Sequence, residues 1–543
     1  MTARWMRVFA PLILCGSSIF AQQRSPLVEN GYSIRGVVVS AKTGKPLGRA
    51  EVTLSTIQFA KITADTTGED GVFAFENLKA GVYILQAVRR GYNTSRYDEH
   101  ESFFSSIVTG PGLDTGNLRF VLSPQALIAG TVVDGAGEPV RGAQVMLYRK
   151  NSSDGLGKIA QASSQQTDDI GQFEFARLSP ADYFVAVSAT PWYATRPQPR
   201  PDAKGNPLDE PVSHSALDVA YPLTFYADAG DSDAATPIPV RAGDRVQLSF
   251  SLRAVSALHL RFRFPEGQKQ ITVWPQLMQD IFGQQLQLTS SAVSHSPGFA
   301  ETDGVAPGRY DIHFAGAGSQ RGEIAHADLT ADTTFDNPPA DPRVEVLGKL
   351  TMMDGEKLPA PMVVSLQTPA STNNFGAVVA NDGTFKIDGV RSGAYELQIG
   401  GPRTAYSLVH IAVDGASIDG DLIKIGASPV NLAAVVTPDS ANVSGYVKQN
   451  GKAASGAMVV LVPRDPGANR ELFRRDQSNS DGSFQLRGVA PGAYTIIAIA
   501  DGWSLDWGRP EVIGLYLAHG VKVNVGLSER NIVASQTVQI QQR

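Results

Sequence analysis

The sequence predicts an all-β protein, a tandem array of about five antiparallel β-sandwich modules of the prealbumin-like or immunoglobulin-like kind. Three observations lead to this prediction. Short segments alternate apolar with polar residues, turns containing glycine or proline separate them, and one motif recurs five times along the chain. The length of 543 residues allows several domains, and 42% hydrophobic residues is ordinary for packed cores.

In each copy of the motif, a turn with glycine leads into a strand with an aromatic residue. Ten or eleven residues after that aromatic residue, beyond a second turn, a tyrosine opens the next strand. A tyrosine in this place can bury its ring in the core and bond its hydroxyl to nearby backbone, as in a tyrosine corner. The aromatic–tyrosine pairs are Phe73 and Tyr83, Phe173 and Tyr183, Phe299 and Tyr310, Phe385 and Tyr395, and Phe484 and Tyr494.

A second shared piece lies upstream of the motif, where a strand with glycine precedes a turn and another strand. It is clear in modules 1, 2 and 5, whose strands contain Gly36, Gly130 and Gly445, while module 4 opens at Gly348. The expected organisation is a signal peptide at 1–21, sandwiches at 30–123, 124–254 (with a Pro-rich insert), 255–339 (degenerate), 340–437 and 438–530, and a tail at 531–543.

The first residues predict export. Arg4 and Arg7 precede the mostly apolar residues 8–20, and Ala21 is a suitable residue for cleavage. We therefore expect a mature chain in the periplasm, on the outer cell surface or outside the cell, without an integral membrane span. The one cysteine, Cys15, lies in this leader, so no disulfide or thiolate chemistry is expected beyond it; lipid attachment at Cys15 is an alternative, although Leu14 is larger than that signal favours.

These stretches resemble the carboxypeptidase regulatory-like domain, a transthyretin-like (prealbumin-like) sandwich grouped with Cna-B-type and carbohydrate-binding-like folds. The resemblance covers nearly all of the expected mature chain and is weakest in the third module. Residues 221–226 and 503–511 also look like multi-module envelope proteins of soil bacteria. The resemblance implies the fold and no particular reaction.

Neither an enzyme nor a cofactor is expected. The eight histidines are scattered, and neither a nucleophile elbow nor a phosphate-binding loop occurs. The lysine and acid of a Cna-B-type isopeptide bond would fall on residues such as Val38 and Ala87, which cannot form it. Aspartates at 228, 231 and 233 could supply oxygen ligands to calcium, but turns favour the same residues, so no metal is expected. The net charge of −6 argues against nucleic acid.

Two groups of aromatic residues are candidate ligand contacts. Trp503 and Trp507 stand beside Asp501 and Asp506 in a loop after the fifth tyrosine strand, and Trp192 and Tyr193 open the insert of the second module. Indoles beside carboxylates can stack on a sugar ring and bond its hydroxyls. The alternative is that these aromatics fold down over their own sandwich edges.

The sequence thus predicts a non-catalytic secreted or envelope-associated protein that binds carbohydrate or protein partners, such as a polysaccharide or an envelope protein, at the cell surface. A structural spacer or scaffold without a specific ligand is the alternative.

Overall fold

A computed structural model of the chain describes residues 31–153, 155–196, 215–263, 273–287, 292–296, 299–316, 321–336, 343–368, 374–402, 406–419, 422–467 and 470–543. The predicted signal peptide, Cys15 and most of the Pro-rich insert lie outside these residues. The described chain is strand-rich, and its one α-helix is the short α1 (Pro510–Ile513). The predicted all-β array of about five modules is confirmed.

Module 1 consists of two sheets that face each other across a hydrophobic core. Alternating residues such as Val38, Phe73, Leu85 and Phe120 point into it and are fully buried. One sheet has the order β4 (Val72–Leu78), β1 (Tyr32–Ser40), β8 (Leu118–Leu122); the other contains β3 (Lys61–Thr66), β2 (Glu51–Thr56), β5 (Gly81–Val88), β6 (Ser95–Arg96) and β7 (Ile107–Thr109).

Module 2 repeats this plan, with a long excursion after its tyrosine strand that carries the insert. One sheet is β12 (Gln172–Leu178), β9 (Ala126–Asp134) and β17 (Arg245–Leu252), and the other is β11 (Lys158–Gln166), β10 (Gln144–Asn151), β13 (Ala181–Ser188), β15 (Thr224–Phe225) and β16 (Ile238–Val240). A 3-10 turn, η1 (Ser232–Ala234), and the small pair β14 (Val219–Ala220) and β18 (Val255–Ser256) complete it.

Modules 3 and 4 each consist of two further sheets. Module 3 has β22 (Ala292–Ser296), β23 (Phe299–Val305), β19 (Leu258–Arg263) and β26 (Thr333–Asp336) in one sheet, and β21 (Gln284–Gln287), β20 (Val273–Ile281), β24 (Gly308–Gly316) and β25 (Arg321–Leu329) in the other. Module 4 has β30 (Thr384–Val390), β27 (Val344–Met352), β35 (Val430–Thr437) and β32 (Ser407–Asp414), facing β29 (Asn374–Val378), β28 (Val363–Gln367), β31 (Gly393–Gly400), β34 (Leu422–Ile425) and β33 (Ala416–Asp419).

Module 5 extends to the last residues, which corrects the expected tail at 531–543. Both β43 (Asn531–Val533) and β44 (Val538–Gln541) pair with β36 (Ala441–Gln449), and β44 also pairs with β41 (Gly492–Ile499). Val538 is fully buried in the module core. The other elements are β37 (Lys452–Ala453), β38 (Met458–Pro463), η2 (Arg470–Leu472), β39 (Arg474–Gln477), β40 (Ser483–Val489), η3 (Gly502–Ser504), η4 (Gly514–His519) and β42 (Val521–Val525).

One pairing departs from a purely antiparallel sandwich in every module. The first and last strands run parallel: β1 with β8, β9 with β17, β19 with β26, β27 with β35, and β36 with β43 and β44. Parallel neighbours need a long crossover connection, and here the rest of the module supplies it. The alternating sequence pattern gives the strands but not their relative direction.

The recurring tyrosine behaves as predicted. In each module its hydroxyl donates a hydrogen bond to the backbone oxygen four residues earlier, over 2.8 to 3.1 Å. Four of the five rings are buried, and that of Tyr83 is partly buried. The tyrosine-corner prediction is therefore confirmed in all five modules.

The recurring glycine has a steric reason. Gly36, Gly130, Gly348 and Gly445 each lie opposite the motif phenylalanine of the neighbouring strand. A Cβ atom on any of them would come within 2.7 Å of the phenylalanine ring. The ring occupies the space that a side chain would fill, so one position of the pair must be empty.

The third module reverses this pair, which explains why its motif is weak. Phe262 of β19 lies opposite Ala300 of β23, and both are fully buried. The large residue has moved to the first strand and the small one to the motif strand. The expected motif aromatic, Phe299, is therefore one position out of register, since it pairs with Arg263 instead.

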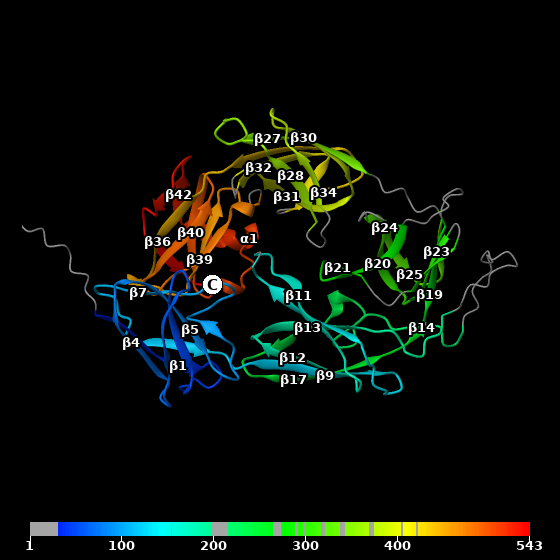
Figure 1. The fold of residues 1–543 in the computed structure, drawn as a ribbon, viewed down its shortest axis with the longest axis horizontal. Helices are drawn as coiled ribbons and strands as arrows, with labels where there is room; N and C mark the ends of the chain where they lie inside the picture. Colours follow the sequence, from blue (N-terminus) through cyan, green and yellow to red (C-terminus); the bar gives the residue numbers. More distant parts are fainter. Residues whose placement is uncertain are drawn as a thin grey trace, which may run out of the picture.

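The modules follow one another around a closed loop rather than along a line (Figure 1). Modules 1 and 2 lie side by side, module 3 lies beyond module 2, module 4 lies opposite them, and module 5 returns to module 1. Hydrogen bonds join module 5 to modules 1 and 2, which lie more than 300 residues away in sequence.

Candidate functional site

The loop with the two predicted ligand-binding tryptophans lies inside the molecule. Trp503 and Trp507 are each 8% exposed and pack on the outer face of the β38–β41 sheet, against Met458 and Ile499 among others. Neither indole offers a free face to a sugar. The expectation that they contact a ligand is therefore wrong for this arrangement, and the alternative of aromatics folded over their own sandwich describes them better.

These tryptophans also complete the contact between module 5 and module 1. The His100 ring stacks on Trp503 at 5.0 Å between ring centres, and Phe103 lies 5.5 Å from it. The guanidinium of Arg475 lies over Trp507 at 4.4 Å and over Phe103 at 5.0 Å. The side chain of Arg475 is 5% exposed and pairs with Glu101 at 2.8 Å, so its buried charge has a partner.

The two aspartates beside the tryptophans have separate roles. Asp506 forms an ion pair with Lys150 of module 2, with 2.8 Å between Nζ and Oδ1. The Trp507 indole donates to the Ser152 backbone oxygen at 3.0 Å. Asp501 is exposed, has a left-handed backbone with φ of 50°, and makes no side-chain capping bond to η3. The cluster predicted from sequence is thus divided between an interface and a turn.

Trp192 and Tyr193, the other predicted pair, remain at the surface. Trp192 is 79% exposed, and its ring meets that of Tyr193 edge to face at 5.8 Å. Tyr193 is partly buried. Among the six predicted ligand contacts, Trp192 alone is an aromatic residue with a largely exposed ring.

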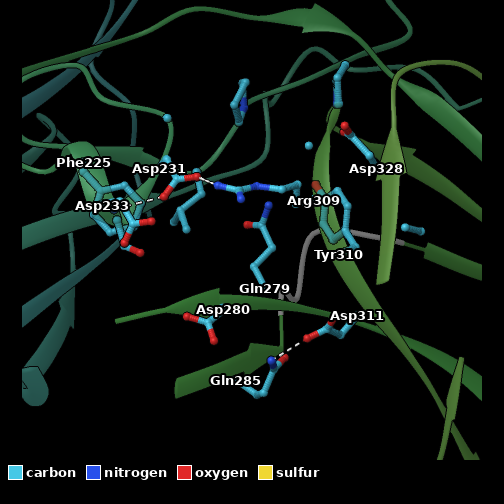
Figure 2. A pocket seen from close by; sticks show the side chains of 17 residues that line it. Phe225, Asp231, Asp233, Gln279, Asp280, Gln285, Arg309, Tyr310, Asp311 and Asp328 are labelled. Carbon is cyan, nitrogen blue, oxygen red and sulfur yellow. Dashed lines mark hydrogen bonds and ion pairs between the residues drawn. The ribbon is translucent and has the colours of Figure 1, made fainter. Parts of the chain in front are cut away.

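A polar cleft between modules 2 and 3 is the main feature that the sequence did not reveal (Figure 2). It encloses about 530 Å³ between the η1 region of module 2 and strands β20, β21, β24 and β25 of module 3. Five aspartates and one arginine are among the residues that line it: Asp231, Asp233, Asp280, Asp311, Asp328 and Arg309.

The polar groups of the cleft belong to both modules. Arg309 of module 3 forms an ion pair with Asp231 of module 2, and Gln285 donates to Asp311 at 2.5 Å. The Oε1 atoms of Gln279 and Gln285 are buried and have no hydrogen-bond partner among the described residues. The cleft therefore carries surplus negative charge, and two amide oxygens of its lining residues are buried without a hydrogen-bond partner among the described residues.

The walls of the cleft explain its position. The β20–β21 turn of module 3 places Phe282 against Tyr148, Phe184 and Phe225 of module 2, at 5.0 to 5.8 Å between ring centres. This aromatic contact fixes one module against the other beside the cleft. Asp228, Asp231 and Asp233 were visible in the sequence, but their neighbours from the third module were not. No group of acidic or histidine side chains among the described residues has the geometry of a metal site.

A buried charged group lies at the same junction. His259 of β19 stands between two carboxylates, with Nε2 2.6 Å from Asp218 and Nδ1 2.7 Å from Asp303. Burial of His259 lowers its pKa, but the hydrogen bonds to Asp303 and Asp218 outweigh burial and raise the pKa to about 9. The imidazolium therefore connects the module 2 segment of Asp218 to two strands of module 3. His259 is 7% exposed, so the imidazolium lies inside the junction and not on a solvated strand face.

These features define the class of protein: a compact array of five β-sandwiches whose module-specific loops form the contacts between modules. A family comparison covers parts of the first two modules. Residues 33–122 and 127–203 match the model of the carboxypeptidase regulatory-like domain, so these stretches are similar to that domain. No curated protein matches the chain.

Three solved structures illustrate the similarities to known folds. The TIE protein of Bacillus anthracis is 14% identical with a TM-score of 0.17, and the match covers 57% of this chain and half of that protein. The shaft pilin SpaA of Lactobacillus rhamnosus GG is 12% identical, with 41% and 97% covered and a TM-score of 0.18. BcpA, the major pilin subunit of Bacillus cereus, is 8% identical, with 75% and 100% covered and a TM-score of 0.16. No functional argument follows from values of this size.

Proposed function

We propose that this chain is an exported, non-catalytic binding protein of the cell envelope, and that it holds its ligand in the cleft between modules 2 and 3. The charged, then apolar, then small-residue order of residues 1–21 supports export. No helix among the described residues is long and apolar enough to span a membrane. The observation that carries the proposal is the cleft itself, because polar groups of two modules converge there, as is common for ligand sites between domains.

The closed arrangement favours binding over the spacer alternative. A spacer gains its reach by placing modules end to end. Here module 5 contacts both module 1 and module 2 through buried side chains. A closed array holds the clefts between its modules in a fixed geometry, but it is shorter than the same modules placed end to end.

The charge of the cleft favours a cationic protein segment over a polysaccharide. Five carboxylates face one guanidinium, so an ammonium or guanidinium group would find excess negative charge there. Sugar binding commonly uses an exposed aromatic face, but Phe225 and Tyr310 in the cleft wall are 1% and 4% exposed. The ligand that fits is a lysine or arginine side chain presented by a partner protein.

Binding of lysine-containing peptides to the full chain tests this proposal. The double variant Asp233→Asn and Asp328→Asn removes two exposed carboxylates of the cleft, and we expect about a tenfold loss of affinity, with binding that weakens as salt rises. Asp169→Asn is the matched control, because Asp169 is exposed on module 2 and does not line the cleft. Equal affinity of the double variant and the control would refute the cleft as the site.

Trp192 supports carbohydrate binding as a second candidate function. An indole that is 79% exposed beside Tyr193 is a platform on which a sugar ring can stack. Trp192→Ala should lower retention on a glycan array without changing the melting temperature. Tyr446→Ala, at a tyrosine that is 52% exposed in module 5, should change neither. Unchanged glycan retention in Trp192→Ala would remove this candidate.

A further inference from the structure

The face of module 5 that docks on modules 1 and 2 has the composition of a specific recognition surface. Two tryptophans and a buried arginine form its centre, and these residue types dominate the energetics of protein–protein contacts. The module 1 segment that covers them, residues 98–106, presents a carboxylate beside two rings: Glu101 meets Arg475, while His100 and Phe103 meet Trp503.

The surrounding polar contacts follow the backbone of that segment closely. Gln477 donates to the backbone oxygen of Asp98 at 2.5 Å, and Ser105 donates to the Ser478 backbone oxygen at 2.8 Å. The Ser480 amide donates to the Ser106 oxygen at 3.0 Å. Backbone oxygens of this module 1 segment thus accept hydrogen bonds from module 5, and these bonds fix the register of the contact.

The close fit extends to positions without side chains. A Cβ atom on Gly456 would lie 2.2 Å from the Asp98 carboxylate, and one on Gly155 of module 2 would lie 2.7 Å from the Trp507 ring. Both glycines have a positive φ, of 77° and 73°. The two surfaces are therefore complementary in shape as well as in chemistry.

Module 5 nevertheless keeps a core of its own. Its central cluster contains residues of module 5 alone, and the core of module 1 likewise contains only module 1 residues. Module 5 follows module 4 directly, because β35 ends at Thr437 and β36 begins at Ala441. Its link to module 1 is wholly non-covalent.

We propose that this contact is exchangeable: the docking face of module 5 also accepts residues 98–106 and the module 2 turn of a second copy, and two copies associate by exchanging their fifth modules. In this structure, the surface that fits the docking face consists of residues 98–106 and the module 2 turn of the same chain. A second copy carries the same surface, so an identical chain is the partner whose chemistry and shape fit. Reciprocal exchange uses each contact twice and closes a symmetric dimer. This inference concerns a different surface from the cleft and does not depend on the proposed function.

The full chain, refolded at concentrations that span about a hundredfold, tests the exchange by light scattering after size separation. We expect a dimer whose fraction rises with the refolding concentration. Phe103→Ala and Glu101→Ala weaken a contact that each chain makes once in the closed monomer and once in the exchanged dimer, so each should leave the dimer association constant within about threefold of the parent value. Phe59→Ala is the matched control, since Phe59 is a module 1 phenylalanine that is 61% exposed. A parent chain that stays monomeric, or a dimer association constant that Phe103→Ala and Glu101→Ala lower tenfold or more while Phe59→Ala does not, would overturn the proposal.

A disulfide experiment locates the contact in the dimer. All copies carry Cys15→Ser, which removes the single cysteine of the chain. Copies with Ser106→Cys are mixed with copies with Ser480→Cys, refolded together and oxidised; we expect a covalent heterodimer. Ser528→Cys, at an exposed serine of module 5, should give at least tenfold less when paired with Ser106→Cys. Equal crosslinking by Ser480→Cys and Ser528→Cys would show that the dimer uses another surface.

Discussion

Removal of the Tyr494 hydroxyl should destabilise the fifth module out of proportion to the size of the change. Tyr494 is 3% exposed, and its hydroxyl donates a hydrogen bond of 2.8 Å to the backbone oxygen of Ala490, which is 1% exposed. Tyr494→Phe leaves that buried oxygen without this donor, at a cost of about 1–3 kcal/mol. Tyr494→Ala removes the ring as well and should cost about 3–5 kcal/mol.

Denaturant unfolding of residues 438–543 measures both effects. Tyr446→Phe is the matched control, because Tyr446 is 52% exposed in the same module and should change the free energy of unfolding by less than about 0.5 kcal/mol. A stability of Tyr494→Phe equal to that of the control would refute the argument, because the corner bond would then contribute nothing.

The same tyrosine predicts a dependence on pH. Burial raises the pKa of Tyr494 to about 12, above its ordinary value near 10. Because the folded pKa is the higher one, the stabilisation is complete below pH 10 and is lost as the pH rises through 12. The parent fragment should therefore lose stability in that range, and Tyr494→Phe should lose less.

Three further predictions concern other parts of the fold. Residues 438–543 should unfold cooperatively, whereas residues 438–530 should give a poorly dispersed NMR spectrum, because they lack β43 and β44. A well-folded 438–530 fragment would mean that residues 531–543 are a tail outside the fold after all. Gly445→Ala should cost about 1–3 kcal/mol in denaturant unfolding, because the new Cβ would lie 2.7 Å from the Phe484 ring, and an unchanged midpoint would contradict the steric account. The pKa of His259 is raised to about 9 in the folded chain, which corresponds to roughly 3 kcal/mol of folding stability that is present below pH 6.5 and lost as the pH rises through 9. The melting temperatures of the parent and His259→Gln should therefore converge over that range. A constant difference would count against the charged contact of His259 with its two carboxylates.

Much of the fold was predictable because it depends on local patterns. Alternating apolar residues mark strands, and the spacing from motif phenylalanine to tyrosine reflects one hairpin that each module repeats. The third module shows the limit of this reasoning. Its core keeps one large and one small residue, as Phe262 and Ala300, but exchanges them between strands. A search for a phenylalanine at one fixed position misses this pair. The two positions together keep the same side-chain volume, but neither keeps its residue type.

The candidate site was harder to predict, because it depends on how modules meet. The aspartates at 231 and 233 have a polar sequence context that turns also produce, and Arg309 lies 78 positions from its partner Asp231. The same reason explains the error at Trp503 and Trp507. Their position after a strand correctly indicated a loop, but the loop's surroundings include His100 and Phe103, about 400 residues away in sequence.

Small-angle X-ray scattering of the full chain in dilute solution tests most directly whether the array is closed. The structure predicts a compact particle in which module 5 lies against modules 1 and 2. Glu101→Ala combined with Lys150→Ala, which removes an ion pair to each of those modules, should shift the profile toward a longer particle. A parent profile that already matches five modules strung out in a line, and that the double variant leaves unchanged, would contradict the closed array.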